Sequence, residues 1–151
     1  MLKLSRKTLL ALEAVIDIAF NARPEPVQAK EITARQGVPQ RYLEQVMQQL
    51  VRSGILKGVR GPRGGYRLAK ERRRISVGDI VRVAEAIEDA ENEPAKPISD
   101  LGQRIVTPLV QSLQQELMQR LDGITVEDLC RQARAEGVTS GEVPVTADFT
   151  I

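Results

Sequence analysis

Residues 36–69 read QGVPQRYLEQVMQQLVRSGILKGVRGPRGGYRLA. Gly37 is suited to end one helix at positive φ, and Pro39 is suited to begin the next, where its missing N–H costs nothing. Apolar side chains then recur at intervals of three and four residues, namely Leu43, Val46, Met47 and Leu50. Two strand-like segments, 55–59 and 66–69, follow on either side of a glycine-rich turn. The stretch therefore predicts a helix followed by a β-hairpin.

The residues upstream predict two more helices. Ser5 is a suitable N-cap for an amphipathic helix that ends before a proline-containing loop. A short helix over 29–36 comes next and is separated from the helix of residues 39–53 by only a tight turn, which predicts a helix-turn-helix. With the hairpin as a wing, residues 1–83 are expected to form a winged helix-turn-helix domain in a mainly α-helical fold.

One face of the 39–53 helix is rich in long polar side chains. These are Gln40, Arg41, Glu44, Gln45, Gln48 and Arg52. Arginine pairs with guanine, glutamine pairs with adenine and glutamate accepts from cytosine, so such a helix can read base edges in a major groove. An ordinary solvated helix presents a similar face. The helix alone leaves both interpretations open.

The hairpin favours nucleic acid. Its tip, residues 60–65, carries Arg60 and Arg63 among three glycines and a proline. This composition lets a cationic loop approach a minor groove closely. The loop lacks the Gly-Lys-Ser/Thr ending of a nucleotide-binding P-loop, which argues against that alternative. Further cations flank the hairpin and are candidates for phosphate contacts, namely Lys57, Arg67, Lys70, Arg72, Arg73 and Arg74.

Charge and composition narrow the function. Residues 1–82 hold 17 Lys and Arg against 7 Asp and Glu, whereas residues 83–151 hold 5 against 13. The basic half favours a polyanionic partner, although two solvated surfaces of opposite sign would give the same counts. The absence of histidine and the single cysteine weaken enzyme and metal-site hypotheses. Because neither a membrane-spanning apolar run nor a signal peptide is recognisable, we expect a cytoplasmic protein.

The C-terminal half predicts a means of self-association. After a helix capped by Ser76, residues 84–106 are expected to connect the domain to a long helix and to be a candidate sensor segment, irregular over 88–99. Thr107 and Pro108 predict the start of that helix, which carries a wide apolar stripe. The stripe consists of Leu109, Val110, Leu113, Leu117, Met118 and Leu121. It packs either on its own domain or, as we expect after such a connection, against a second copy in a symmetric homodimer.

A last helix is predicted by Thr125, which has Asp128 three residues later as in a capping box. We therefore assign residues 107–136 to dimerisation helices and 137–151 to a loose tail. Cys130 is expected to be a small, partly buried hydrophobic residue, with a redox switch as the alternative.

Several motifs resemble those of the Rrf2 family of bacterial regulators. The motifs are Gln36-Gly37-Val38, Tyr42-Leu43-Glu44-Gln45, Val59 to Leu68, Ser76 to Ile80 and Ile124 to Leu129. The resemblance covers about residues 1–130. It implies a dimeric winged-helix protein that binds an imperfect palindrome in double-stranded DNA, in most members as a repressor. It also implies that Arg41, Tyr42, Glu44 and Gln45 occupy recognition positions and that Arg60 enters the minor groove.

The chain departs from the family between the domain and the long helix. Sensing members carry three cysteines there that hold an iron-sulfur cluster, and residues 88–106 contain none. Because cluster irons need thiolate or imidazole ligands, we expect no cluster, no metal and no other cofactor. We expect any signal to be a small organic effector bound near residues 88–106, or DNA binding to be constitutive.

The leading hypothesis is thus a sequence-specific DNA-binding transcriptional regulator that acts as a homodimer. The alternative is a winged-helix protein-interaction scaffold whose acidic half binds a partner. A scaffold does not need two arginines on a glycine-rich tip, and no paired-carboxylate pocket is readable that would support an enzyme.

Overall fold

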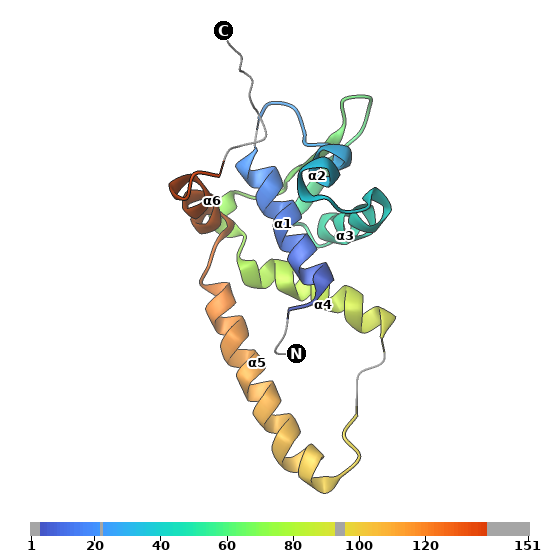
Figure 1. The fold of residues 1–151 in the computed structure, drawn as a ribbon, viewed down its shortest axis with the longest axis vertical. Helices are drawn as coiled ribbons and strands as arrows, with labels where there is room; N and C mark the ends of the chain where they lie inside the picture. Colours follow the sequence, from blue (N-terminus) through green and yellow to red (C-terminus); the bar gives the residue numbers. More distant parts are fainter. Residues whose placement is uncertain (1–3, 22, 93–95, 139–151) are drawn as a thin grey trace.

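The first helix begins at the predicted cap. The computed structural model describes residues 4–21, 23–92 and 96–138 (Figure 1). Ser5 precedes α1 (Arg6–Phe20), and its Oγ accepts a hydrogen bond from the backbone N–H of Thr8 at 3.1 Å. This bond satisfies one of the donors that a helix N-terminus leaves free.

The helix-turn-helix forms as predicted. α2 (Ala29–Gln36) ends at Gly37, whose φ of +70° lies in the left-handed region that glycine adopts without strain. After Pro39, α3 (Gln40–Arg52) begins and buries one face completely against the core. The buried residues of α3 are the predicted ones: Leu43, Val46, Met47 and Leu50.

The hairpin is a two-stranded antiparallel wing, formed by β1 (Leu56–Val59) and β2 (Gly65–Leu68). It is held to the body by Val27, which exchanges two backbone hydrogen bonds with Tyr66 at 3.0 and 2.7 Å. A Cβ on Gly65 would lie 2.4 Å from the Val27 carbonyl oxygen. The glycine-rich sequence therefore permits the close backbone approach that anchors the wing.

Two helices with matching caps close the body. The 3₁₀ turn η1 (Arg72–Arg74) leads to α4 (Val77–Glu91), and α6 (Val126–Ala135) lies beside their junction. Ser76 and Thr125 each form a capping box. The two caps are joined because the Val77 N–H donates to the Ile124 carbonyl at 2.8 Å and the Val126 N–H donates to the Ile75 carbonyl at 2.9 Å.

The helix α6 belongs to the core of the N-terminal body. Val126 and Cys130 have no exposed surface and are part of the same buried cluster as α1 and α3. The expected dimerisation helices of residues 107–136 thus separate: α6 packs on the body, whereas α5 (Thr107–Asp122) extends away from it (Figure 1). Of the predicted tail, residues 139–151 lie outside the described residues.

The connection between α4 and α5 is more helical than predicted. Residues 88–91 continue α4, so the irregular part is shorter than 88–99. The α-helix α5 begins at the predicted Thr107, but helical structure already starts after Ser99, whose Oγ accepts from the Gly102 N–H at 3.0 Å. It runs into α5 through the π-helical stretch η2 (Gly102–Val106).

Pro108 explains both the predicted start of α5 and the wide turn before it. A proline lacks an N–H and its ring crowds the carbonyl of residue i−4, so a regular α-helix is disturbed there. In the structure the Thr107 N–H donates to the Gly102 carbonyl, a hydrogen bond of the wider π type. Pro108 therefore sits inside a continuous helix rather than at its first turn. None of the described helices is long and apolar enough to cross a membrane.

Candidate nucleic-acid interface

The predicted reading face of α3 is fully available. Gln40, Arg41 and Glu44 are exposed, and so are Gln45 and Gln48 on the next turn. This exposure follows from the helical period, because burial of the Leu43 to Leu50 face turns the intervening positions outward. The helix therefore presents donors and acceptors of several lengths along one solvent-facing side.

Tyr42 is placed differently from the other predicted residues of α3. Its ring is half-buried and packs against the core cluster. The ammonium Nζ of Lys7, from the first turn of α1, lies 5.9 Å from the centroid of this ring. Tyr42 therefore joins the base of α3 to the start of α1.

The wing separates its three arginines into two groups. Arg60 and Arg63 are exposed at the tip. Arg67 is half-buried on β2, and its guanidinium donates to the backbone carbonyl oxygens of Arg23 and Pro24. The tip arginines are therefore accessible to a ligand, whereas Arg67 is engaged in holding the wing to the loop after α1.

The helix α3 and the wing form one surface. The carboxylate of Glu44 on α3 acts on the hydroxyl of Tyr66 on β2. Burial first, and the negative charge of Glu44 second, raise the pKa of Tyr66. α3 is also in contact with β1, so the exposed face of α3 adjoins the wing.

The cations of this surface lack acidic partners. In the part of the chain that the structure describes, no carboxylate lies within 4.0 Å of Arg41, Arg52, Lys57, Arg60, Arg63, Lys70 or Arg74. Arginines inside the body are paired instead. Arg35 binds Asp17 at 2.6 Å, and Arg72 binds Glu127 at 3.1 Å. The positive field around α3 and the wing is therefore not neutralised by the protein.

Sequence reasoning missed the polar cluster that supports the helix-turn-helix. Asp17 is buried on α1 and accepts two hydrogen bonds from Arg35, at 2.9 and 2.6 Å, and one from Gln36 at 2.9 Å. These bonds fix α2 to α1 and so fix the angle at which α3 leaves the turn. A signal was present, because Asp17 interrupts the apolar run AVIDIAF of residues 14–20.

A second polar pair holds the start of α2. Arg23 donates to both carboxylate oxygens of Glu31 at 2.7 Å, while Glu31 also accepts from the backbone N–H of Gln28 at 2.8 Å. Burial alone would raise the pKa of Glu31, but the hydrogen bonds and the positive charges of Arg23 and Arg35 lower it overall. Gln28 also reaches the wing through a contact to the Pro62 carbonyl at 3.5 Å.

The predicted self-association stripe is only partly covered. No residue of α5 is buried. Leu109 and Leu113 are 57% and 39% exposed, and Val110, Leu117, Met118 and Leu121 are half-buried. The exposed apolar surface continues towards the start of the helix through Leu101, Ile105 and Val106.

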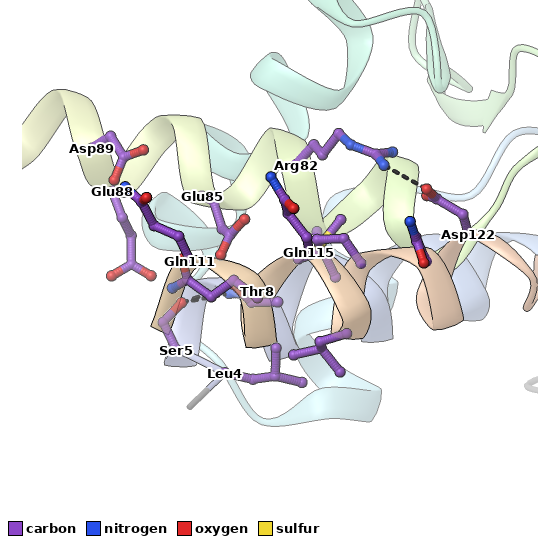
Figure 2. A pocket seen from close by; sticks show the side chains of 15 residues that line it. Leu4, Ser5, Thr8, Arg82, Glu85, Glu88, Asp89, Gln111, Gln115 and Asp122 are labelled. Carbon is purple, nitrogen blue, oxygen red and sulfur yellow. Dashed lines mark hydrogen bonds and ion pairs between the residues drawn. The ribbon is translucent and has the colours of Figure 1, made fainter. Parts of the chain in front are cut away.

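A groove of about 830 Å³ separates α5 from the body. Figure 2 shows Glu85, Glu88 and Asp89 of α4 on one side and Gln111 and Gln115 of α5 on the other. The ion pair of Arg82 and Asp122 lies at one end, with its nitrogen and oxygen 2.6 Å apart. The groove is near the connection for which a small-molecule effector was predicted.

Cys130 is not accessible to a ligand. Its side chain is fully buried. Burial raises the pKa of the Cys130 thiol, although the neighbouring Arg72 acts in the opposite direction. A thiol that is buried and protonated at neutral pH reacts slowly, which favours the predicted hydrophobic role over the redox switch.

The sequence is similar to a family of known regulators. A model of the Rrf2 family, described as an iron-dependent transcriptional regulator, matches residues 4–132. The HTH-type transcriptional regulator IscR of Aliivibrio salmonicida is 35% identical over 129 residues, which cover 85% of this chain and 77% of the relative. The IscR protein of Serratia proteamaculans is 33% identical over 147 residues, or 97% of this chain and 85% of the relative.

The fold is similar to solved structures of such proteins. The structure of T. potens IscR matches with a TM-score of 0.71 and 34% identity, covering 93% of this chain and 94% of that chain. The structure of CymR, the global cysteine regulator of B. subtilis, matches with a TM-score of 0.66 and 31% identity, covering 87% of this chain and 98% of that chain.

Proposed function

This chain belongs to the Rrf2 family of transcriptional regulators, and we propose that α3 and the wing are the surfaces with which it reads its operator. It is a DNA-binding transcriptional regulator with a winged helix-turn-helix fold, and it is not an enzyme. We propose further that it acts in the cytoplasm as a homodimer and represses transcription from the promoters it occupies.

One observation carries the proposed reading surface. The exposed polar face of α3 adjoins a wing whose cations have no acidic partner among the described residues. Unpaired arginines and lysines attract phosphates, and they position a protein on DNA without conveying sequence. The long polar side chains between them supply base-specific donors and acceptors.

Each element has a distinct proposed role. α3 enters the major groove and presents Gln40, Arg41, Glu44, Gln45 and Gln48 to base edges. Arg60 enters the adjacent minor groove, and Arg63 contacts a phosphate or the same groove. Tyr42 and Arg67 orient these two elements, which is consistent with their contacts inside the body.

The proposed dimer joins two chains through α5. Its apolar stripe has no buried member, so a large apolar surface stays in water unless a second copy covers it. A symmetric pair presents the same stripe from each chain, with Leu109, Leu113 and Leu117 near its centre. The two α3 helices then contact half-sites of a palindrome about 34 Å apart, one duplex turn.

The donor set does not fit an iron centre. The family description names iron, but the 151 residues include no histidine, and the one cysteine is buried in the core away from the connection before α5. No group of three or more Cys, Asp or Glu in the described residues is arranged to hold a metal ion. Iron-sulfur clusters need several thiolate or imidazole ligands. We therefore propose a regulator that works without a cluster.

We propose the groove between α4 and α5 as the place where an organic effector would act. It has the size of a small-molecule site and lies between the DNA-binding body and the proposed dimer helix. A ligand there could change the angle between the two and thereby the spacing of the reading helices.

Selection from random duplex DNA tests the proposed function. The purified chain should enrich a palindromic sequence, and its affinity for that sequence should fall steeply as salt rises. Enrichment of no sequence at any salt, together with stoichiometric capture of a protein partner from nuclease-treated lysate, would favour the scaffold alternative. Transcription in vitro from a promoter that contains the selected site should decrease when the protein is added, and an increase would contradict repression.

A further inference from the structure

Lys7 occupies an unusual position for a lysine. It lies in the first turn of α1, where the helix dipole disfavours a positive charge. Its side chain is nevertheless only 13% exposed, although the contact that its ammonium group makes with Glu91 lies at the surface. Partners of opposite or partial negative charge offset the unfavourable interaction with the helix dipole.

The two partners of Lys7 come from different elements. Its Nζ forms an ion pair with the Glu91 carboxylate, on the last residue of α4. The same Nζ lies 5.9 Å from the centroid of the Tyr42 ring on α3, within the range of a cation–π interaction. One ammonium group therefore pairs with the end of α4 and lies over a ring of the proposed recognition helix.

The end of α4 is the place where the chain leaves the body. Beyond Glu91 the connection leads to Ser99 and then to α5. Glu88 and Asp89, on the same last turn of α4, line the groove beside α5, as do Ser5 and Thr8 on either side of Lys7. A movement of this last turn displaces the carboxylate that holds Lys7, and the lysine in turn contacts Tyr42.

We infer that Lys7 is a positioning residue for the recognition helix, through which the end of α4 influences DNA binding. This inference rests on the proposed reading of DNA by α3. The ring of Tyr42 is fixed on one side by the core and on the other by the Lys7 ammonium. Loss of either Lys7 or its Glu91 partner leaves that side of the ring unsupported, and α3 then samples orientations that fit the operator less well.

A set of variants tests this inference with the full chain and the selected operator. Lys7→Met and Glu91→Gln should each weaken binding to the operator by about fivefold, the lower range of coupling between distant sites. The double variant should bind no more weakly than Lys7→Met alone, because Glu91 acts through the lysine. Lys96→Met and Glu13→Gln, which changes an exposed carboxylate of α1, are matched controls for the lost charges, and both should bind nearly as wild type does. Thermal unfolding should show that all variants fold.

Tyrosine fluorescence gives a readout that does not depend on DNA. The chain has no tryptophan and two tyrosines, so Tyr66→Phe leaves Tyr42 as the only emitter. In that background, both Lys7→Met and Glu91→Gln should change the Tyr42 emission, and Glu13→Gln should not. Lys7→Arg, which keeps the charge, should restore most of the operator affinity.

Two results would overturn the inference. If Lys7→Met lowers the salt dependence by about one ion and Glu91→Gln strengthens binding, Lys7 contacts a DNA phosphate directly. If the effects of Lys7→Met and Glu91→Gln are additive, the two residues act separately. Failure of the random selection to yield any operator would instead reject the proposed reading surface, and the fluorescence arm would still test the contact between Lys7 and Tyr42.

Discussion

At the scale of single residues, the position of the wing depends on a close backbone contact between β2 and the body. Gly65 faces the Val27 carbonyl, and that carbonyl accepts the Tyr66 N–H at 2.7 Å. Any side chain at residue 65 would push β2 away from this carbonyl. The absence of a side chain at residue 65 thus allows the wing to lie against the loop that carries Val27.

Gly65→Ala should therefore destabilise the protein. The added methyl group would overlap the backbone carbonyl of Val27, and overpacking of this kind costs about 1 to 3 kcal/mol. Urea unfolding followed by circular dichroism measures the loss. Gly58→Ala, in the partner strand, is the matched control because a Cβ there meets nothing within 4 Å. Equal losses in the two variants would contradict the proposed crowding.

Arg60→Ala should weaken binding to the selected operator by about 1 to 3 kcal/mol and relax its sequence preference, because Arg60 is proposed to enter the minor groove. Lys70→Ala should weaken binding to all duplexes alike, as expected for a phosphate contact. Fluorescence anisotropy with the operator and a scrambled duplex measures both. If Arg60→Ala lost the same affinity on both duplexes, its role would be that of a phosphate contact.

At the scale of elements, local sequence signals predicted most boundaries. α2 and α3 have the predicted limits because Gly37 and Pro39 restrict the backbone directly. The predicted start of α5 at Thr107 is confirmed, but the helical turns before it were missed because Ser99 supplies an earlier cap. The exposed face of α3 followed from its period, but the bond between Asp17 and Arg35 joins residues 18 apart and leaves no periodic trace.

Removal of Arg35 should loosen α2 from α1. Arg35→Met leaves the buried Asp17 carboxylate with fewer donors, and we expect a loss of about 2 kcal/mol in the free energy of unfolding. Differential scanning calorimetry should show a lower midpoint. Arg131→Met removes an exposed ion pair of α6 and should change the stability by less than about 0.5 kcal/mol. If both variants lost a similar free energy of unfolding, the buried Asp17–Arg35 pair would matter no more to stability than the exposed pair.

Glu31 should make the stability of α2 depend on pH. Its pKa in the folded chain is lower than the ordinary value of 4.5, so its ionised form favours folding. This contribution is complete above about pH 4.5 and is lost as the pH falls through the folded pKa. This prediction can be tested by urea unfolding of wild type and Glu31→Gln at several pH values between about 3 and 7, a range that spans the ordinary carboxyl pKa of about 4. The difference between the two proteins should shrink in acid, and a constant difference would contradict the assignment.

At the scale of the whole molecule, α5 is, among the helices of residues 4–21, 23–92 and 96–138, the one long helix without a buried face. The sequence predicted the apolar stripe of α5 but also assigned α6 to dimerisation. Both helices follow the connection and both carry regular apolar spacing, so the pattern does not show which of them packs on the body. The distinction arises from tertiary packing, since α6 returns to the body through the paired caps at Ser76 and Thr125.

Leu113→Asp should dissociate the proposed dimer. Dimerisation would withdraw a carboxylate in the middle of the stripe from water without giving it a partner, which is costly. In a symmetric interface this cost arises twice, once on each chain. Light scattering at micromolar concentration should report the mass of a single chain. Ser112→Asp adds the same charge at the next, exposed residue and should remain dimeric. A wild-type chain that scatters as a monomer would reject the dimer itself.

Because α6 packs back on the body, the core of the winged domain can be completed only late in synthesis. Val126 and Cys130 complete the core beside α1, but they leave the ribosome after all of α5 has emerged. A growing chain therefore displays its apolar α5 while the winged domain still lacks its last packing elements. For the proposed dimer, subunit pairing and completion of the winged domain therefore fall in the same interval of translation.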